Sequence, residues 1–397
     1  MARMRTTDKA KPTIVALVVL ALLARSGTAR KYFIEVVYPD EGGCIAPSGV
    51  RGNCININNC PGILSLLKTR PVSPDAMGRV LKSQCGFEGK TPKVCCERNI
   101  TPTERPVQPV DDTQPPDVTK HPNLRLLGYK NCGPFNSDKI IGGNVTRINE
   151  IPWMALLSYD TGKGRPEFRC GGSILNKRYI LTAAHCVAQL PPGLRLIGVR
   201  VGEHDFAKER DCEAVGTSEE VCAERYQDFQ IESVTSHEKY STVNYHNDIA
   251  IIRVNRDIDF RPDNVKPVCM PIGSSAKISS KKLMVTGWGV TEQRIASTVL
   301  LKIYLPIYSQ DECAKTYQRQ AAIWHKQICI GGEQGKDSCS GDSGGPLVAP
   351  SVYNGTPRYV QYGVVSFGIK LCGTQGFPGV YTRLNFYLDW LLDNMRD

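Results

Sequence analysis

Cysteine content constrains this chain more than any other feature of its sequence. The 397 residues include sixteen cysteines, an even number that is typical of proteins folded in an oxidising compartment. Six of them lie within residues 44–96. The neighbours Cys95 and Cys96 are too close to bridge each other without strain, so each is expected to reach a different partner. The cluster predicts a small scaffold held by three disulfides. A zinc site is the alternative, which the ligand spacing and the compartment disfavour.

The N-terminus agrees with export to such a compartment. Residues 1–29 contain five basic side chains, an apolar run from Ile14 to Leu23 and four small or polar residues that end at Ala29. This order is typical of a signal peptide cut after Ala29. A transmembrane anchor is the alternative, but about ten apolar residues are too few to cross a bilayer. We therefore expect a secreted, extracellular protein with no membrane span.

The positive charge does not indicate a nucleic-acid partner. The formal net charge is +10, but residues 1–29 carry five Lys/Arg and one Asp, so the secreted chain is nearer +6. No block of basic residues follows the signal, and the cysteine usage argues against nucleic-acid binding. A solvated basic surface explains the remaining charge.

The composition changes twice along the chain. Residues 97–131 are polar and proline-rich and predict an extended, exposed linker between two domains. Beyond Cys132, short β-branched runs recur between turn residues and predict an all-β, barrel-type domain of about 250 residues. The last apolar run, 386–392, has helical spacing. Three sequons are candidates for N-glycosylation, at Asn99, Asn144 and Asn354.

Residues 337–346, Asp-Ser-Cys-Ser-Gly-Asp-Ser-Gly-Gly-Pro, carry the clearest chemistry. A serine becomes a nucleophile only when a base takes its proton and donors stabilise the oxyanion. Gly341 permits the tight turn that could aim two N–H groups at one point beside Ser343. Asp342 lies in a segment that hydrates it poorly, so it needs a cationic partner. The alternative is a Gly/Ser turn with solvated aspartates.

Two further segments supply a base and a carboxylate. His185 follows the small residues Ala183 and Ala184, and an imidazole can act as a base near neutral pH. Asp248 begins an apolar strand, where it could hold the N–H of a neutral imidazole. Taken singly, a structural histidine and a strand-entry aspartate are the ordinary interpretations.

The order His185, Asp248, Ser343 is that of the chymotrypsin-like proteases. Residues 140–397 resemble the chymotrypsin/trypsin-like serine proteases along essentially their whole length. The resemblance implies two six-stranded antiparallel β-barrels with a C-terminal helix. It also implies that Ser343 is the nucleophile, that His185 shuttles the proton, that Asp248 orients His185, and that the N–H groups of Gly341 and Ser343 hold the oxyanion.

The same resemblance assigns the remaining carboxylates. Cleavage after Lys139 would free an ammonium at Ile140, which in the family inserts beside the aspartate that corresponds to Asp342. An ordinary linker-to-strand junction is the alternative. Asp337 corresponds to the floor of the substrate pocket, where a carboxylate attracts Lys or Arg. Its walls would be Gly368 and Gly379, and Phe367 replaces the family's commoner Trp beside the pocket.

Residues 44–96 resemble the clip domain of arthropod extracellular protease cascades. With the protease resemblance, this implies most of the disulfides, and Cys212 and Cys222 remain to pair with each other. The expected pairs are Cys44–Cys95, Cys54–Cys85, Cys60–Cys96, Cys132–Cys269, Cys170–Cys186, Cys212–Cys222, Cys313–Cys329 and Cys339–Cys372.

Together these features predict the zymogen of a trypsin-like endopeptidase in an extracellular cascade, in a haemolymph-like fluid. Melanisation through prophenoloxidase activation, or processing of a Toll ligand, is the expected context. The partners would be protein substrates, an upstream activating protease and a serpin-type inhibitor. No cofactor is required; near Glu203, calcium and a solvated acidic loop are both open interpretations. A non-catalytic clip-domain scaffold, a developmental or clotting protease and a digestive trypsin are the alternatives. Ser343 argues against the scaffold, and the clip-like domain argues against the digestive enzyme.

Overall fold

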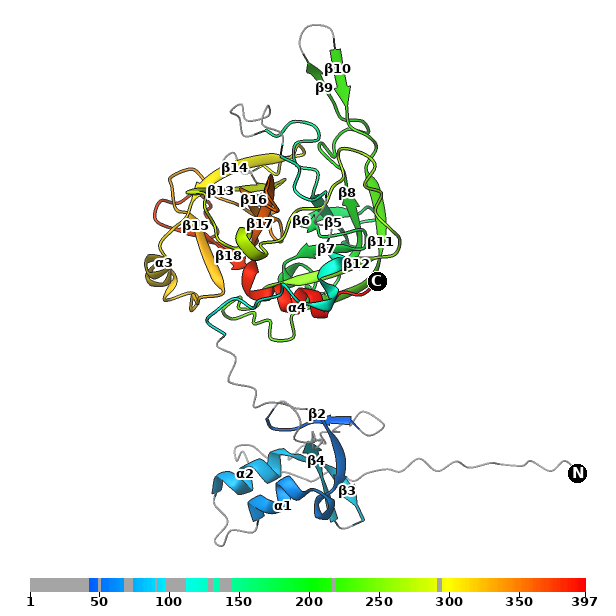
Figure 1. Ribbon diagram of the computed structural model, residues 1–397, viewed down its shortest axis with the longest axis vertical. Helices are drawn as coiled ribbons and strands as arrows, with labels where there is room; N and C mark the ends of the chain where they lie inside the picture. Colours follow the sequence, from blue (N-terminus) through cyan, green and yellow to red (C-terminus); the bar gives the residue numbers. More distant parts are fainter. Residues whose placement is uncertain are drawn as a thin grey trace, which may run out of the picture. The chain divides into compact units, whose positions relative to one another are not determined.

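The computed structural model of the chain divides into two compact units, within residues 1–110 and within residues 111–397 (Figure 1). Among the described residues, no helix is both long and apolar enough to cross a bilayer. The predicted signal peptide, Asn99, Lys139, Ile140 and Asn144 lie outside these residues. The structure describes residues 43–48, 51–67, 74–89, 91–97, 112–127, 131–135, 145–215, 219–290 and 295–397.

The first unit is a small antiparallel sheet with two short helices. Its strands lie in the order β1-β2-β4-β3. Cys95 and Cys96 are neighbours on β4, so their side chains point to opposite faces of the sheet. Cys95 is joined to Cys44 and Cys96 to Cys60, while Cys54 is joined to Cys85. The elements are β1 (Gly43–Ile45), β2 (Arg51–Asn56), a 3-10 turn η1 (Ile57–Asn59), α1 (Pro61–Leu67), α2 (Pro74–Lys82), β3 (Gln84–Glu88) and β4 (Thr91–Glu97).

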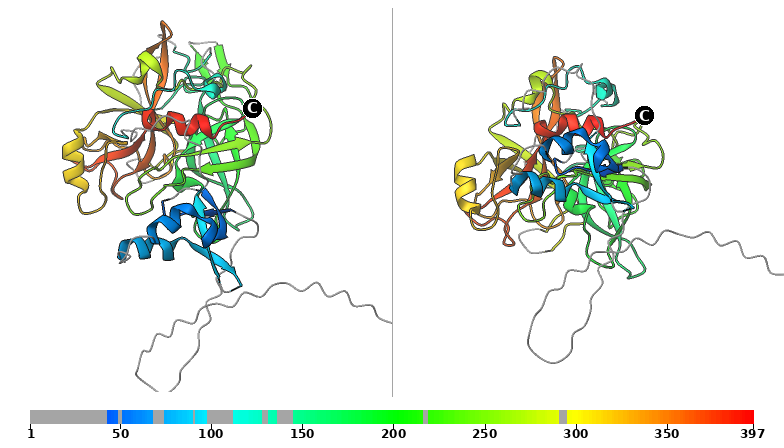
Figure 2. Two further views of the ribbon diagram at one scale, coloured as in Figure 1. Left: turned by 60° about the horizontal axis from the view of Figure 1, so that its bottom comes forward. Right: turned by 90° about the horizontal axis from the view of Figure 1, so that it is seen from below.

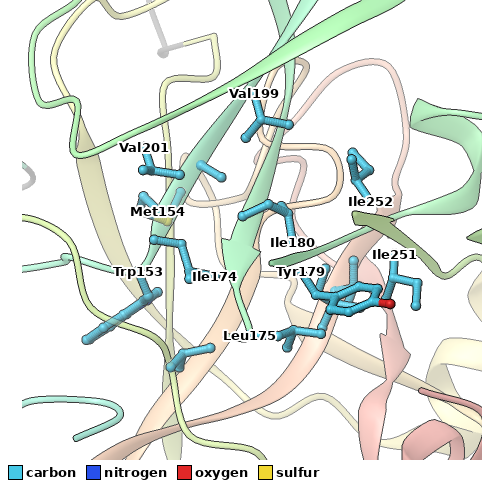
Figure 3. Packing of buried hydrophobic residues seen from close by; sticks show 14 of the residues in the cluster. Trp153, Met154, Ile174, Leu175, Tyr179, Ile180, Val199, Val201, Ile251 and Ile252 are labelled. Carbon is cyan, nitrogen blue, oxygen red and sulfur yellow. The ribbon is translucent and has the colours of Figure 1, made fainter. Parts of the chain in front are cut away.

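The second unit begins with a closed antiparallel barrel of six strands in the order β11-β12-β7-β6-β5-β8. Short continuous apolar runs are typical of strands that are buried on both sides, and every residue of β7 and β12 is buried. Trp153, Ile180 and Ile251 are among the side chains that fill this core (Figure 3). The strands are β5 (Met154–Asp160), β6 (Glu167–Ile174), β7 (Tyr179–Thr182), β8 (Arg195–Val201), β11 (Gln227–Ser236) and β12 (Ala250–Val254).

The other half is a six-stranded antiparallel sheet in the order β14-β13-β16-β17-β18-β15. We expected a second closed barrel. Instead, in the described part of this half, the edges β14 and β15 are joined near one end by an isolated bridge between Ile307 and Ile330. The all-β, chymotrypsin-like fold class is confirmed, with one closed barrel and one nearly closed sheet. The strands are β13 (Lys282–Gly287), β14 (Leu301–Pro306), β15 (Gln327–Gly331), β16 (Pro346–Tyr353), β17 (Thr356–Phe367) and β18 (Pro378–Arg383).

The chain ends in the predicted helical segment. A 3-10 turn, η6 (Leu384–Tyr387), leads into α4 (Leu388–Asp393). The apolar side chains of Leu388, Leu391 and Leu392 are buried. The red C-terminal segment lies between the orange and green halves of the second unit (Figure 2). The remaining elements are η2 (Pro122–Leu126), η4 (Ala184–Cys186), β9 (Cys212–Val215), β10 (Glu219–Cys222), η5 (Gly273–Ala276) and α3 (Gln310–Tyr317).

Residues 112–127 belong to the second unit. Most of them are exposed, as predicted for 97–131, but the prediction is wrong for Val118 and Leu127, which are buried. Val118 and Leu127 belong to the main hydrophobic core, with exposures of 4% and 3%. Asn123 Nδ2 donates to the carbonyls of Leu392 and Met395, at 2.9 and 3.1 Å. These bonds tie the segment to the end of α4 and to the residues that follow it. We call residues 112–127 the strap.

Candidate active site

Strand register brings His185 and Asp248 together. In the antiparallel pair of β7 and β12, Thr182 lies opposite Ala250. The chain that leaves β7 therefore emerges beside the chain that enters β12. His185 is three residues beyond Thr182, and Asp248 is two residues before Ala250. Residues 63 positions apart in sequence thus meet at one edge of the barrel.

The buried carboxylate of Asp248 fixes His185 in two ways. Its side chain is 0% exposed, and Oδ2 lies 2.8 Å from His185 Nδ1. Oδ1 accepts the backbone N–H of His185 at 2.9 Å. Burial lowers the pKa of His185, but the charge and hydrogen bond of Asp248 outweigh it, so the pKa lies above its ordinary value. The imidazole is 22% exposed and so remains open to solvent or substrate.

A third donor to Asp248 was missing from the sequence analysis. Ser366 Oγ donates to Asp248 Oδ2 at 2.6 Å. Ser366 lies in β17, where it is the polar residue in the buried run Gly-Val-Val-Ser. A buried hydroxyl needs a partner, so a serine inside an apolar strand is the signal that could have found it.

The Ser343 loop packs against the same edge of the barrel. Gly171 N donates to Ser343 O at 2.8 Å, and Gly171 belongs to β6, beside β7. Gly344 has a φ of +78°, and a Cβ there would lie 2.2 Å from Thr182 Oγ1. Only glycine permits this approach. Ser343 is thereby held near the end of β7, the strand that leads to His185.

Two backbone donors beside Ser343 are unoccupied. Gly341 has a φ of +104°, in the left-handed half of backbone space that favours glycine. In the described part of the chain, no hydrogen bond takes up the N–H groups of Gly341 or Ser343. Such donors are available to an anionic oxygen.

Asp342 has hydrogen bonds but no ion pair among the described residues. Gly289 N donates to Oδ1 at 2.8 Å and Cys339 N donates to Oδ2 at 2.9 Å. Burial raises the pKa of Asp342 to about 6, against the lowering effect of these bonds. Asp342 also lines a cavity of about 770 Å³ whose wall includes Gly287, Gly289 and β14 residues. The cation that the sequence analysis required is therefore absent from the described chain.

Asp337 lines the same cavity as Asp342, and its Oδ1 lies beside Gly379. Its Oδ1 is buried without a hydrogen-bond partner among the described residues. A Cβ on Gly379 would lie 3.0 Å from that oxygen, and a Cβ on Gly368 would lie 4.0 Å from Gly379 Cα. Burial raises the pKa of Asp337 to about 7. Beside it, Ser338 Oγ and Tyr381 OH are 2.9 Å apart. Asp337 Oδ2 accepts the N–H of Gly373 at 3.4 Å, so one oxygen of the carboxylate remains for a cationic side chain.

An aromatic pair borders the histidine. Tyr245 stacks on Phe367 with ring centroids 4.8 Å apart and meets the His185 ring edge-on at 6.4 Å. Tyr245 has a φ of +52°, which is uncommon for a bulky residue. Phe367 is therefore part of a wall next to the His185 imidazole, as well as a neighbour of Gly368.

The acidic loop near Glu203 holds two carboxylates, one of which has an oxygen without a partner among the described residues. Asp211 Oδ2 accepts the N–H groups of His204 and Asp205, whereas the buried Oδ1 has no partner among the described residues. Burial and the charge of Asp211 raise the pKa of Glu203. Arg200 Nη1 lies 3.1 Å from Glu203 Oε2. An orphaned carboxylate oxygen beside a second buried carboxylate matches the oxygen ligands that calcium prefers, with Arg200 as the competing partner.

The structure also places the remaining predicted residues. Each of the sixteen cysteines forms the disulfide that was expected for it, including Cys132–Cys269 and Cys339–Cys372. Asn354 is exposed at the turn between β16 and β17. Its sequon is sterically open to modification.

Fold and site together define the class of protein. A histidine oriented by a buried aspartate lies near a serine loop with two unused N–H donors, on a chymotrypsin-like fold. This is the arrangement of a serine endopeptidase.

Comparison with known proteins gives the family. The sequence profile of the family described as Trypsin matches residues 140–391, and that of the Regulatory CLIP domain of proteinases matches residues 44–96. Serine protease ea of Drosophila melanogaster is 37% identical, over 96% of this chain and 98% of that protein. Melanization protease 1 of the same species is 36% identical, over 93% and 96%. The crystal structure of the Drosophila Grass clip serine protease of the Toll pathway has a TM-score of 0.63 and 34% identity, covering 90% of this chain and 98% of that one. The chain belongs to the clip-domain, trypsin-like serine proteases.

Proposed function

We propose that this chain is the secreted zymogen of an endopeptidase that cleaves protein substrates after Arg or Lys in an extracellular cascade. The observation that carries the proposal is the buried Asp337 carboxylate, with its unpartnered oxygen, on the same loop as Ser343. The Asp337 carboxylate supports the specificity for basic side chains, and Ser343 supports the cleavage chemistry.

The proposed mechanism uses the residues in the positions described. Ser343 Oγ attacks the substrate carbonyl carbon while His185 takes the hydroxyl proton. The N–H groups of Gly341 and Ser343 stabilise the oxyanion. His185 then gives the proton to the leaving amine nitrogen, and water hydrolyses the acyl-enzyme by the same steps. Asp248 keeps the imidazole oriented and stabilises its protonated form.

Specificity is tested by replacing Asp337. Asp337→Ser removes the carboxylate that would pair with a buried basic side chain, so kcat/KM for an Arg substrate should fall about a hundredfold or more. Ser338→Ala, at the adjacent position, keeps the carboxylate and should keep the Arg/Lys preference. Unchanged selectivity in Asp337→Ser would show that another residue sets it.

Activation is proposed to require a cut after Lys139. The new ammonium of Ile140 would enter the cavity that Asp342 lines and supply the missing cation. Lys139→Gln should leave an inert protein under conditions that activate the wild type. Full activity of the uncut variant would refute this step.

A role in immunity is supported by the relatives' names, which refer to melanization and to the Toll pathway. We propose a prophenoloxidase, one of its activating proteases or a Toll ligand precursor as substrate. An upstream protease would cut the zymogen, and a serpin-type inhibitor would stop the enzyme. Incubating the cut enzyme with each candidate and sequencing the new N-termini tests this. Absence of cleavage after Arg or Lys in all of them would contradict the cascade role.

Calcium is proposed as a structural ligand rather than a catalytic one. Glu203 and Asp211 would supply carboxylate oxygens. Calcium should raise the melting temperature of the wild type and not that of Asp211→Asn. Equal melting temperatures with calcium and with a chelator would exclude the site.

A further inference from the structure

A buried ion pair ties the start of the protease chain to β14. Lys302 Nζ lies 2.5 Å from Glu150 Oε1, and the two side chains are 7% and 8% exposed. Glu150 Oε2 accepts the N–H of Arg147 at 2.9 Å. Removing two charges from water is costly, so a buried ion pair is better explained by the geometry that it specifies than by stability.

Two more contacts fix the same segment upstream. Val145 forms an isolated bridge with Leu301. Thr146 is 3% exposed, and its N–H and its hydroxyl both donate to Leu300 O, at 3.0 and 2.8 Å. Residues 145–150 are therefore held at both ends against β14 and the residue before it.

The β14 residues in these contacts also line the cavity next to Asp342. Leu301 and Lys302 lie in its wall, together with Gly289 and Asp342. Val145 is five residues beyond Ile140. At about 3.3–3.6 Å per residue, that length spans roughly 17 Å when fully extended. The segment thus begins its attachment at the cavity that holds the carboxylate.

We propose that Glu150 and Lys302 are positioning residues for activation. Together with the contacts of Val145 and Thr146, the pair holds residues 145–150 on β14. The free tether of the new α-amine is then five residues long and starts at the cavity of Asp342. This rests on the proposed cut after Lys139. A short tether gives the amine a high effective concentration at its acceptor, which falls roughly as the −3/2 power of tether length. Release of residues 145–150 would double the free length and lower this effective concentration about threefold.

The test measures the exposure of the amine as well as activity. Wild type, Glu150→Gln, Lys302→Met and the double variant are cut after Lys139 and treated with cyanate, which carbamylates an accessible α-amine. In a mostly inserted wild type, a threefold lower effective concentration raises the free fraction of the amine up to threefold, so both single variants and the double variant should be carbamylated up to about threefold faster. The active fraction should fall by the amount by which the free fraction rises. Lys302→Arg keeps the pair and should restore protection. Protection in the double variant equal to wild type would overturn the proposal.

A matched control separates positioning from general loss of stability. Arg253→Met removes another ion pair, Arg253–Glu232, whose arginine side chain is also 7% exposed. This control should be carbamylated at the wild-type rate; an increase equal to that of Glu150→Gln would overturn the proposal. The proposed function fails separately, if cutting the wild type gives no gain over the uncut Lys139→Gln protein.

Discussion

At the scale of single residues, the position of His185 depends on one buried carboxylate. Asp248 accepts the main-chain N–H of His185, its Nδ1–H and the hydroxyl of Ser366. Hydrogen bonds to a charged group are stronger than neutral ones, at about 1.5–3 kcal/mol each. Each donor therefore restricts where the carboxylate can turn.

Ser366→Ala tests this arrangement. Losing one donor lets the carboxylate rotate and weakens its hold on the imidazole, so kcat should fall about tenfold with little change in KM. Thr382→Val is the control, because Thr382 Oγ1 donates to the main-chain oxygen of Asp248 at 2.7 Å rather than to the carboxylate. Steady-state kinetics would measure kcat for both variants. An equal fall in kcat would show that the hydrogen bond from Ser366 to the Asp248 carboxylate has no special role.

Burial of Asp337 predicts a pH dependence for substrate binding. A cation binds only the ionised carboxylate, and the pKa of Asp337 is raised to about 7. Affinity should therefore be complete above pH 7 and should fall as the pH drops through 7, by about tenfold per unit. Benzamidine, an amidinium that stays charged, is a suitable probe for calorimetry with Ser343→Ala protein. A constant affinity from pH 5 to 8 would contradict the assignment.

At the scale of elements, the strap is part of the second unit although its sequence is proline-rich like a linker. Val118 and Leu127 are buried, and Arg125 pairs with Asp397 at 2.5 Å. Burial of an apolar side chain such as Val118 or Leu127 contributes about 1.5–3 kcal/mol to the free energy of unfolding. The strap therefore adds a noncovalent attachment to the one that Cys132–Cys269 provides.

We predict that this attachment survives loss of the disulfide. The variant Cys132→Ala/Cys269→Ala, cut after Lys139, should elute from a sizing column with both chains together. Adding Leu127→Asp, which buries an unpaired charge, should release the N-terminal chain. Separation of the chains in the cysteine variant alone would show that the strap is too weak to hold them.

The same elements show where sequence reasoning was sufficient. Strand β12 reads as a continuous apolar run, and the apolar spacing of 386–392 matches the terminal helical segment. The strap reads as a proline-rich linker because its apolar residues, such as Val118 and Leu127, are widely spaced and pack against distant segments. Local periodicity does not report such contacts. Ser366 was missed for the same reason, since its partner is 118 residues away.

At the scale of the whole molecule, the site is assembled from both halves of the second unit. The barrel supplies His185 and Asp248 through the register of β7 and β12. The other half supplies Ser343, Asp337 and Ser366. The order of the motifs in the sequence predicted that His185, Asp248 and Ser343 lie in one site. The nearly closed second sheet could not be derived from it, because it depends on how the strand ends pack.

The central claim is that Ser343, placed by this assembly, cleaves peptide bonds after basic residues. The most direct measurement is the turnover of matched Arg and Phe peptide amides by protein cut after Lys139, as wild type and as Ser343→Ala. Wild type should cleave the Arg amide at least a hundredfold more efficiently than the Phe amide, and Ser343→Ala should cleave neither. Turnover retained in Ser343→Ala would contradict the account.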